Sequence, residues 1–409
     1  MGDILMQRNK VNSKNILTYI MILVALFSST YSWGYLMFYV IAILLFARTG
    51  FKLQLGSVKK YYWLYFIPNV VIFIHAISTV AVYHETFHLS RAFNNFVYIL
   101  MCILSTYSLY YLHKKRSIEI ILNAIFTYYL YNVAVALFSV GFVPFVTNIV
   151  RPGSTLLTKW LEQHDIGLSL GLIIIYYIFF NNEHTKSKRR YLICSIIVFV
   201  LCSKRIALGA LAAVCIFKFF YGRRLDKRGR LTLIWGIAGV IICLAFVYTV
   251  SNEYILGWLW NHGINTMGRT NIYRTFRPYY EFSPTFYGRG SGFTAKTMSL
   301  WAGTQMNAGG ILALHSDILR AFIEYGFIGS ILWYAYYLIF LPRKIASRYE
   351  KYSEVVFVIA IYSFIVYLTD NTSSYMLFQT FYMLIPLCSE AKQNKRIKKL
   401  LHKKEFINA

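Results

Sequence analysis

Four cationic side chains stand where an anion could bind. Lys204 and Arg205 are adjacent and lie between two apolar runs, at the start of an expected helix. Charged groups at membrane depth usually line a cavity or pair with an anion, and helix starts favour anions through their free N–H groups. Arg269 and Arg289 each follow a glycine, and a guanidinium fits phosphate oxygens in a planar fork. This pattern predicts a phosphate site, with snorkelling or solvated cations as the alternative.

A histidine precedes the apolar run that starts near residue 318. His315 is followed by Ser316, a suitable N-cap, and by Asp317 in the expected first turn. Arg320 and Glu324 are four residues apart, so they could neutralise each other on one helix face. The sequence therefore allows two readings: a catalytic or ligand-orienting histidine, or an interfacial histidine beside a structural ion pair.

A second polar cluster, Glu162-Gln-His164-Asp165, precedes the apolar run at 166–180. No second cluster with ligand spacing completes a metal site, so a general base or a sugar-binding group fits these residues better. A simple polar helix start is the alternative. The six cysteines all fall inside apolar segments, where they are typical small buried hydrophobes, and no metal or cofactor site is expected.

The elements that must position these residues are membrane-spanning helices. The chain of 409 residues is 57% hydrophobic and 14% charged, which is too apolar for a soluble protein. Apolar runs recur along nearly its whole length, which predicts an all-α, polytopic membrane protein with about 12 transmembrane helices. We expect these spans near residues 15–30, 32–47, 62–82, 94–112, 118–143, 166–180, 191–203, 206–221, 232–250, 318–341, 354–369 and 373–389.

The distribution of lysine and arginine predicts the topology. One set of loops holds 31 of the 42 cations and the alternating set holds 10, so the first set should be cytoplasmic. Both termini, including a basic tail at 390–409, are then cytoplasmic, and a long loop at 251–317 before the tenth span is extracytoplasmic. We expect a single membrane domain over 1–409, with short interfacial helices near 148–162 and 254–260. The net charge of +26 is explained by this bias, and no nucleic-acid partner is predicted.

This topology places the candidate residues at the outer face, where they could share one outward-facing cavity. In their order and location they resemble the motifs of the Wzy-type oligosaccharide repeat-unit polymerases, within the wider group that contains the O-antigen ligases. The resemblance covers the architecture of the whole chain, and its local matches are Glu162-Gln-His164-Asp165, Ser203-Lys-Arg205-Ile206, Gly268-Arg269-Thr-Asn-Ile-Tyr273, Gly288-Arg-Gly-Ser-Gly-Phe293 and His315-Ser-Asp-Ile-Leu-Arg320 with Glu324-Tyr-Gly326 and Gly329.

The resemblance implies a metal-independent glycosyltransferase in the bacterial cytoplasmic membrane. Its donor and acceptor would be oligosaccharides on polyprenyl pyrophosphate, and a chain-length regulator and a flippase would be possible partners besides membrane lipid. Pyrophosphate would be bound by Arg205 and Arg269, with Lys204 and Arg289. The base would be His315, Glu162 or Asp165. The supporting residues would be His164, Asp317, Arg320 and Glu324. A ligase with another acceptor and a lipid-linked oligosaccharide transporter are the alternatives, although no internal repeat supports a transporter.

Overall fold

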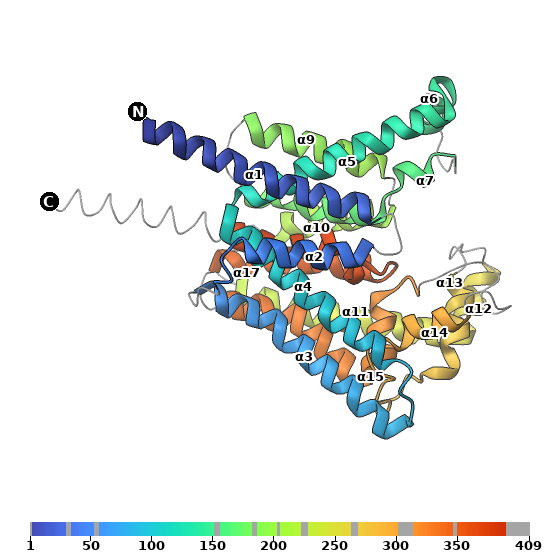
Figure 1. The fold of residues 1–409 in the computed structure, drawn as a ribbon. Helices are drawn as coiled ribbons and strands as arrows, with labels where there is room; N and C mark the ends of the chain where they lie inside the picture. Colours follow the sequence, from blue (N-terminus) through green and yellow to red (C-terminus); the bar gives the residue numbers. More distant parts are fainter. Residues whose placement is uncertain are drawn as a thin grey trace. The chain divides into compact units, whose positions relative to one another are not determined.

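The computed structural model describes residues 2–29, 34–52, 57–150, 156–181, 186–202, 205–221, 228–262, 269–301, 314–346 and 350–389. All regular structure in these ranges is helical, which confirms the predicted all-α class (Figure 1). Five of its helices are long and apolar enough to cross a membrane: Tyr61–Tyr83, Leu89–His113, Arg116–Val140, Leu231–Ser251 and Asp317–Lys344. Shorter apolar helices are Ser13–Ser28, Gly34–Ala47, His164–Phe180, Glu354–Tyr367 and Met376–Ser389.

The helices follow the predicted apolar runs along the chain. In order they are α1 (Gly2–Ser28), α2 (Gly34–Ala47), α3 (Ser57–Tyr83), α4 (Leu89–His113), α5 (Arg116–Val140), α6 (Phe142–Val150), α7 (Thr158–Leu161), α8 (His164–Ile175), α9 (Lys186–Leu201), α10 (Arg205–Tyr221), α11 (Arg228–Ser251), α12 (Glu253–Asn261), α13 (Arg269–Phe276), α14 (Phe293–Trp301), α15 (Asp317–Ala335), α16 (Leu341–Ala346) and α17 (Glu350–Tyr367). The short turns are 3₁₀ at Arg277–Tyr279 and Thr372–Ser374 and π-helical at Tyr176–Phe180 and Tyr336–Phe340.

The chain divides into two compact units. The first comprises Met1–Gln54, Met101–Leu208 and Met376–Ala409. Within it, α1 packs against α2 and α5, and α8 packs against α9. Helix α8 is buried at every position from Ile166 to Ile175, as expected for a helix that is apolar all round and lies inside the protein.

The second unit comprises Leu55–Leu100 and Gly209–Tyr375. Helix α15 contacts α3, α11, α14 and α17 and is the centre of this unit. The interval between α11 and α15, predicted as one long loop, contains α12, α13 and α14. Helix α12 occupies the expected interfacial segment, and its Tyr254 and Trp258 side chains are exposed.

Two glycines interrupt segments that the apolar pattern joins. The predicted span 118–143 ends early, because Gly141 (φ 83°) closes α5 and α6 starts at the next residue. Gly326 has φ 76° and ψ −176° inside α15, a conformation outside the helical region that glycine adopts readily. The break at Gly326 positions the candidate site described next.

Candidate functional site

The glycine-rich segment at 286–293 is docked onto the break in α15. The Arg289 amide donates to the Ile323 carbonyl at 2.9 Å, and the Gly290 amide donates to the Glu324 carbonyl at 2.8 Å. In return the Phe327 amide donates to the Phe286 carbonyl at 2.9 Å. The break frees these helix carbonyls and amides for a second partner.

Glycine is required on both sides of this contact. A Cβ atom at Gly288 (φ 92°) would overlap the backbone nitrogen of Gly326, and one at Gly326 would overlap the carbonyl group of Tyr287. The backbones therefore approach closer than any side chain allows, which fixes the segment against α15.

The opposite side of the segment is held by α3 and the start of α4, within the same unit. His75 Nε2 lies 3.1 Å from the Tyr287 carbonyl, and the Tyr287 hydroxyl lies 2.7 Å from Ser78 Oγ. A Cβ atom at Gly290 would come within 2.7 Å of His88 Nε2, so this histidine lies directly against the segment. Sequence reasoning missed both histidines, because a single histidine, whether inside an apolar run (His75) or between two runs (His88), carries no recognisable motif.

Arg289 is held among aromatic rings. Its Nε donates to the Tyr279 carbonyl at 3.0 Å, and its guanidinium carbon lies 4.2 Å from the Tyr83 ring centroid, in cation–π range. The rings of Tyr279 and Phe293 are 6.0 and 5.8 Å away. Within the described ranges no carboxylate lies within ion-pair distance of Arg289, and its Nη atoms keep their hydrogens available for an anion.

Arg269 differs from the other arginines of α13 and its neighbourhood. It is half-buried at the first described residue of α13. Burial raises the pKa of Tyr273 to about 12, and the positive charge of Arg269 partly opposes this rise. Arg274 and Arg277 instead pair with the two oxygens of Glu253 at 2.6 and 3.3 Å, at a partly exposed position. These two arginines fasten α13 to α12, whereas Arg269 forms no ion pair within the described ranges.

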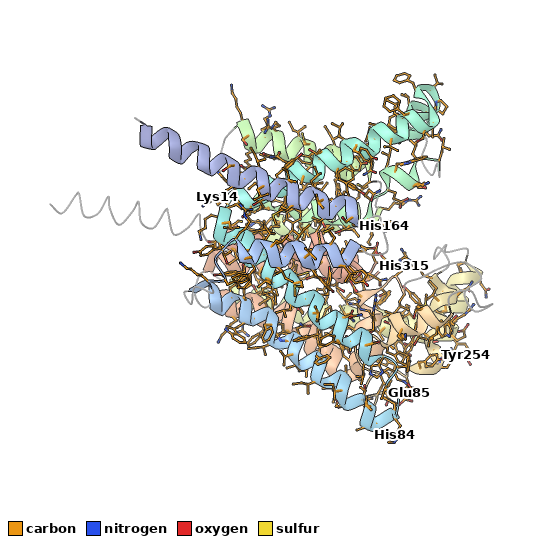
Figure 2. The ribbon with its side chains drawn as sticks, in the orientation of Figure 1. Lys14, His84, Glu85, His164, Tyr254 and His315 are labelled. Carbon is orange, nitrogen blue, oxygen red and sulfur yellow. The ribbon has the colours of Figure 1, made fainter. Side chains whose placement is uncertain are left out.

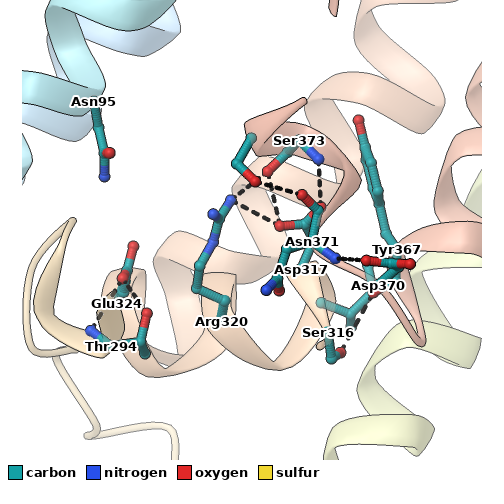
Figure 3. A network of polar contacts seen from close by, with 12 residues as sticks. Asn95, Thr294, Ser316, Asp317, Arg320, Glu324, Tyr367, Asp370, Asn371 and Ser373 are labelled. Atoms are coloured by element: carbon teal, nitrogen blue, oxygen red, sulfur yellow. Dashed lines mark hydrogen bonds and ion pairs between the residues drawn. The ribbon is translucent and has the colours of Figure 1, made fainter. Parts of the chain in front are cut away.

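The start of α15 is fixed by a dense polar network (Figure 3). As predicted, Ser316 caps the helix, accepting from the Leu319 amide at 3.1 Å. Asp317 is fully buried and accepts from the amide and hydroxyl of Ser373 at 2.6 and 2.7 Å. Arg320 Nη2 lies 2.9 Å from Asp317 and also bonds Ser373 Oγ. A buried charge is tolerated only with such compensation.

His315, immediately before this network, has a left-handed backbone (φ 53°) and a half-buried side chain (Figure 2). A residue other than glycine rarely adopts this conformation, which costs of order 1 kcal/mol and persists only where the surroundings impose it. The next two residues, Ser316 and Asp317, are both held by the polar network at the start of α15. The signal for Ser373 was the polar run Asp370-Asn-Thr-Ser-Ser374, of which the sequence analysis placed Ser373 and Ser374 in the predicted span 373–389.

Among the described residues, the i,i+4 spacing of Arg320 and Glu324 does not give a direct ion pair between them. Arg320 turns toward the start of α15, the direction in which helical side chains lean, and pairs with Asp317. Glu324 is buried and accepts from the amide and hydroxyl of Thr294 at 3.2 and 2.6 Å (Figure 3). It therefore caps α14, whose N-terminal N–H groups attract a carboxylate.

The remaining candidates belong to the first unit. His164 Nε2 lies 4.0 Å from Glu162, and its side chain is 42% exposed. Asp165, at the start of α8, accepts from Ser169 Oγ at 3.2 Å and from the Leu377 and Phe378 amides. Arg205 is exposed at the first described residue of α10, and Lys204 lies outside the described residues.

The part of the chain that the structure describes contains no group of three or more His, Cys, Asp or Glu side chains arranged to hold a metal ion. Its fold defines a polytopic helical membrane protein, in which the candidate residues His315 and Arg289 lie before the start of α15 and on the glycine-rich segment docked at Ile323 and Glu324. Residues 191–334 match a family model described as O-Antigen ligase, which supports the resemblance to the Wzy and O-antigen ligase group. The matched segment is just over a third of the chain and runs from α9 to α15. No curated protein matches the chain.

Proposed function

We propose that this chain is a glycan transferase of the cytoplasmic membrane of a bacterium, with both termini inside. It moves a growing oligosaccharide from polyprenyl pyrophosphate onto a hydroxyl of the next lipid-linked repeat unit. The observation that carries the proposal is the clamped glycine segment, which presents the unpaired Arg289 guanidinium within the region similar to O-antigen ligases. Such preorganised cations suit a leaving group that gains negative charge.

In the proposed reaction, the acceptor oxygen forms a bond to the anomeric carbon while the bond from that carbon to the pyrophosphate oxygen breaks. Arg269 and Arg289, with Arg205 and Lys204 as further candidates, stabilise the charge on the departing pyrophosphate. The acceptor proton goes to a base, and His315 is our first choice because its left-handed backbone directly precedes the polar network of α15. Glu162 and Asp165 are the alternative bases.

A ligase that transfers the same donor to a different acceptor is the second candidate, because the matching family model is described as O-Antigen ligase. The two differ in what receives the glycan, so the acceptor decides between them. A chain-length regulator and a flippase remain proposed partners of either enzyme.

The test uses the purified full chain in proteoliposomes with lipid-linked repeat units and excess chelator. A polymerase converts these units into a ladder of longer lipid-linked glycans, since the proposed chemistry uses cationic side chains in place of a metal. A ladder that appears only with added Mg²⁺ or Mn²⁺ would contradict the metal-independent account. Transfer that requires a different acceptor would identify a ligase, and movement of unchanged units across the bilayer would identify a transporter.

A further inference from the structure

A polar cluster in the first unit joins α1 to the ends of α2 and α4. Arg48, the first residue after α2, donates from Nη1 to the Thr18 hydroxyl at 2.7 Å and from Nη2 to the Lys14 carbonyl at 3.2 Å. His113, the last residue of α4, places Nε2 2.8 Å from the same hydroxyl. Thr18 and His113 are buried, Arg48 is half-buried, and Lys14 is exposed on α1 (Figure 2).

This cluster, Lys14, Thr18, Arg48 and His113, carries positive charge without a counter-charge. Across the described ranges no carboxylate lies within ion-pair distance of Arg48 or Lys14. The guanidinium of Arg48 reaches only neutral atoms, and its Nε forms no hydrogen bond there. A half-buried cation in this setting favours an anionic ligand, because desolvation weakens its hydration and leaves its remaining N–H groups to be satisfied.

Two exposed apolar rows lead to the same cluster. On α2 three exposed apolar side chains recur every four residues, and Arg48, whose amide bonds the Leu44 carbonyl at 3.1 Å, continues that row; Tyr35 and Ile43 beside it are also exposed. On α1 three exposed apolar side chains recur at three and four residues and lead to Lys14, with Ile16 exposed beside them. The rows are Leu36, Val40 and Leu44 on α2 and Val24, Ile20 and Leu17 on α1.

The rows identify the ligand. A ligand that binds Arg48 and Lys14 and also covers the two apolar rows needs both a negatively charged headgroup and acyl chains. A free phosphate ion has the negative charge but no apolar part. Lipid phosphate oxygens match the guanidinium fork and the ammonium group. We infer that the cluster formed by Lys14, Thr18, Arg48 and His113 binds the phosphate of an anionic phospholipid whose acyl chains lie along α1 and α2.

The test measures lipid binding to the purified full chain by native mass spectrometry, titrating phosphatidylglycerol. The site predicts one saturable phosphatidylglycerol that Arg48→Gln weakens by about tenfold, the effect of losing one charge-assisted contact of about 1.4 kcal/mol. Lys14→Gln, at an exposed position that does not threaten folding, should weaken the same binding. The matched control is Arg189→Gln on α9, which removes one exposed cation from the same unit and should leave binding unchanged.

Two competition experiments distinguish an anionic lipid from other sources of phosphate. Phosphatidylcholine, which has a phosphate but no net charge, and inorganic phosphate at equal concentration should each fail to displace the bound phosphatidylglycerol. Displacement by inorganic phosphate would show that the cluster takes the free ion, and displacement by phosphatidylcholine would show that net charge is irrelevant. Equal loss of binding in Arg48→Gln and Arg189→Gln would show general charge attraction. Any one of these three results would overturn the inference.

Discussion

A histidine and an aspartate lie at or just before the start of both α8 and α15, and the two starts are built differently. At α8, His164 is 42% exposed and 4.0 Å from its carboxylate neighbour, and Gln163 makes no side-chain cap. At α15, His315 has a left-handed backbone, Ser316 caps the helix, and Asp317 is fully buried with an arginine and Ser373. The α15 start therefore differs from the α8 start in its left-handed residue, its side-chain cap and its buried ion pair. Asp165 of α8 is held by hydrogen bonds from Ser169, Leu377 and Phe378.

This difference indicates which of the two helix starts is better suited to hold a catalytic group. Catalytic groups need a fixed position, and a strained backbone persists only where several neighbours impose it. At the start of α15, Ser316 and Asp317 are held by several hydrogen bonds, and the Arg289 segment docks farther along the same helix, at Ile323 and Glu324. The following variants test whether the start of α15, and not the start of α8, carries the reaction.

The largest effect is expected at the two histidines. His315→Ala should lower glycan transfer by about hundredfold, the range for loss of a general base, whereas His164→Ala should change it by less than about twofold. Glycan chain length in cells with matched membrane levels of each variant measures this. His315→Asn separates the two roles, since asparagine tolerates a left-handed backbone but is no base. Recovery of activity in that variant would limit His315 to a conformational role.

The two aspartates should differ in stability. Asp317→Ala removes the partner of Arg320 and leaves that charge uncompensated, so we expect a loss of about 3 kcal/mol in the free energy of unfolding. Asp165→Ala strands only hydrogen-bond donors and should cost about 1–2 kcal/mol. Denaturant unfolding in detergent micelles compares them. An equal cost would mean that the Asp317 network is no stronger than the α8 start.

Arginine-to-lysine changes test the phosphate role. Arg269→Lys and Arg205→Lys keep the charge but lose the planar fork, so each should slow transfer by about tenfold, or ~1.4 kcal/mol of activation free energy. Initial rates in proteoliposomes at saturating donor provide the measurement. Wild-type rates in both lysine variants would remove pyrophosphate binding from these residues.

The smallest effect is expected at the arginines that already have a partner. Arg274→Ala and Arg277→Ala each break a partly exposed pair with Glu253, and such pairs contribute at most about 1 kcal/mol. Transfer should stay within about twofold of wild type in the same assay. A loss as large as that of Arg269→Lys would show that the attachment of α12 to α13 shapes the site.

The helical fold could be predicted because each membrane helix corresponds to an apolar run of consecutive residues. The N-cap at Ser316 could be predicted for the same reason, since it bonds a residue only three positions away. The partners of the site residues are not local. Asp317 bonds Ser373, which is 56 residues away, and Arg289 stacks on Tyr83 at the end of α3. In the sequence, Gly326 could not be distinguished from a glycine that only allows close helix packing. In the structure Glu324 accepts a hydrogen bond from Thr294, which lies 30 residues away in the sequence.

The central claim is that glycan transfer takes place at the outer end of α15. It is tested most directly by photo-crosslinking a lipid-linked oligosaccharide that carries a photoreactive group beside its pyrophosphate, followed by mass spectrometry of the labelled peptides. The account predicts that label concentrates on the peptides containing Arg289 and His315 and is competed by unmodified lipid-linked repeat units. Competed label on the α8 start alone, with none on these two peptides, would contradict it.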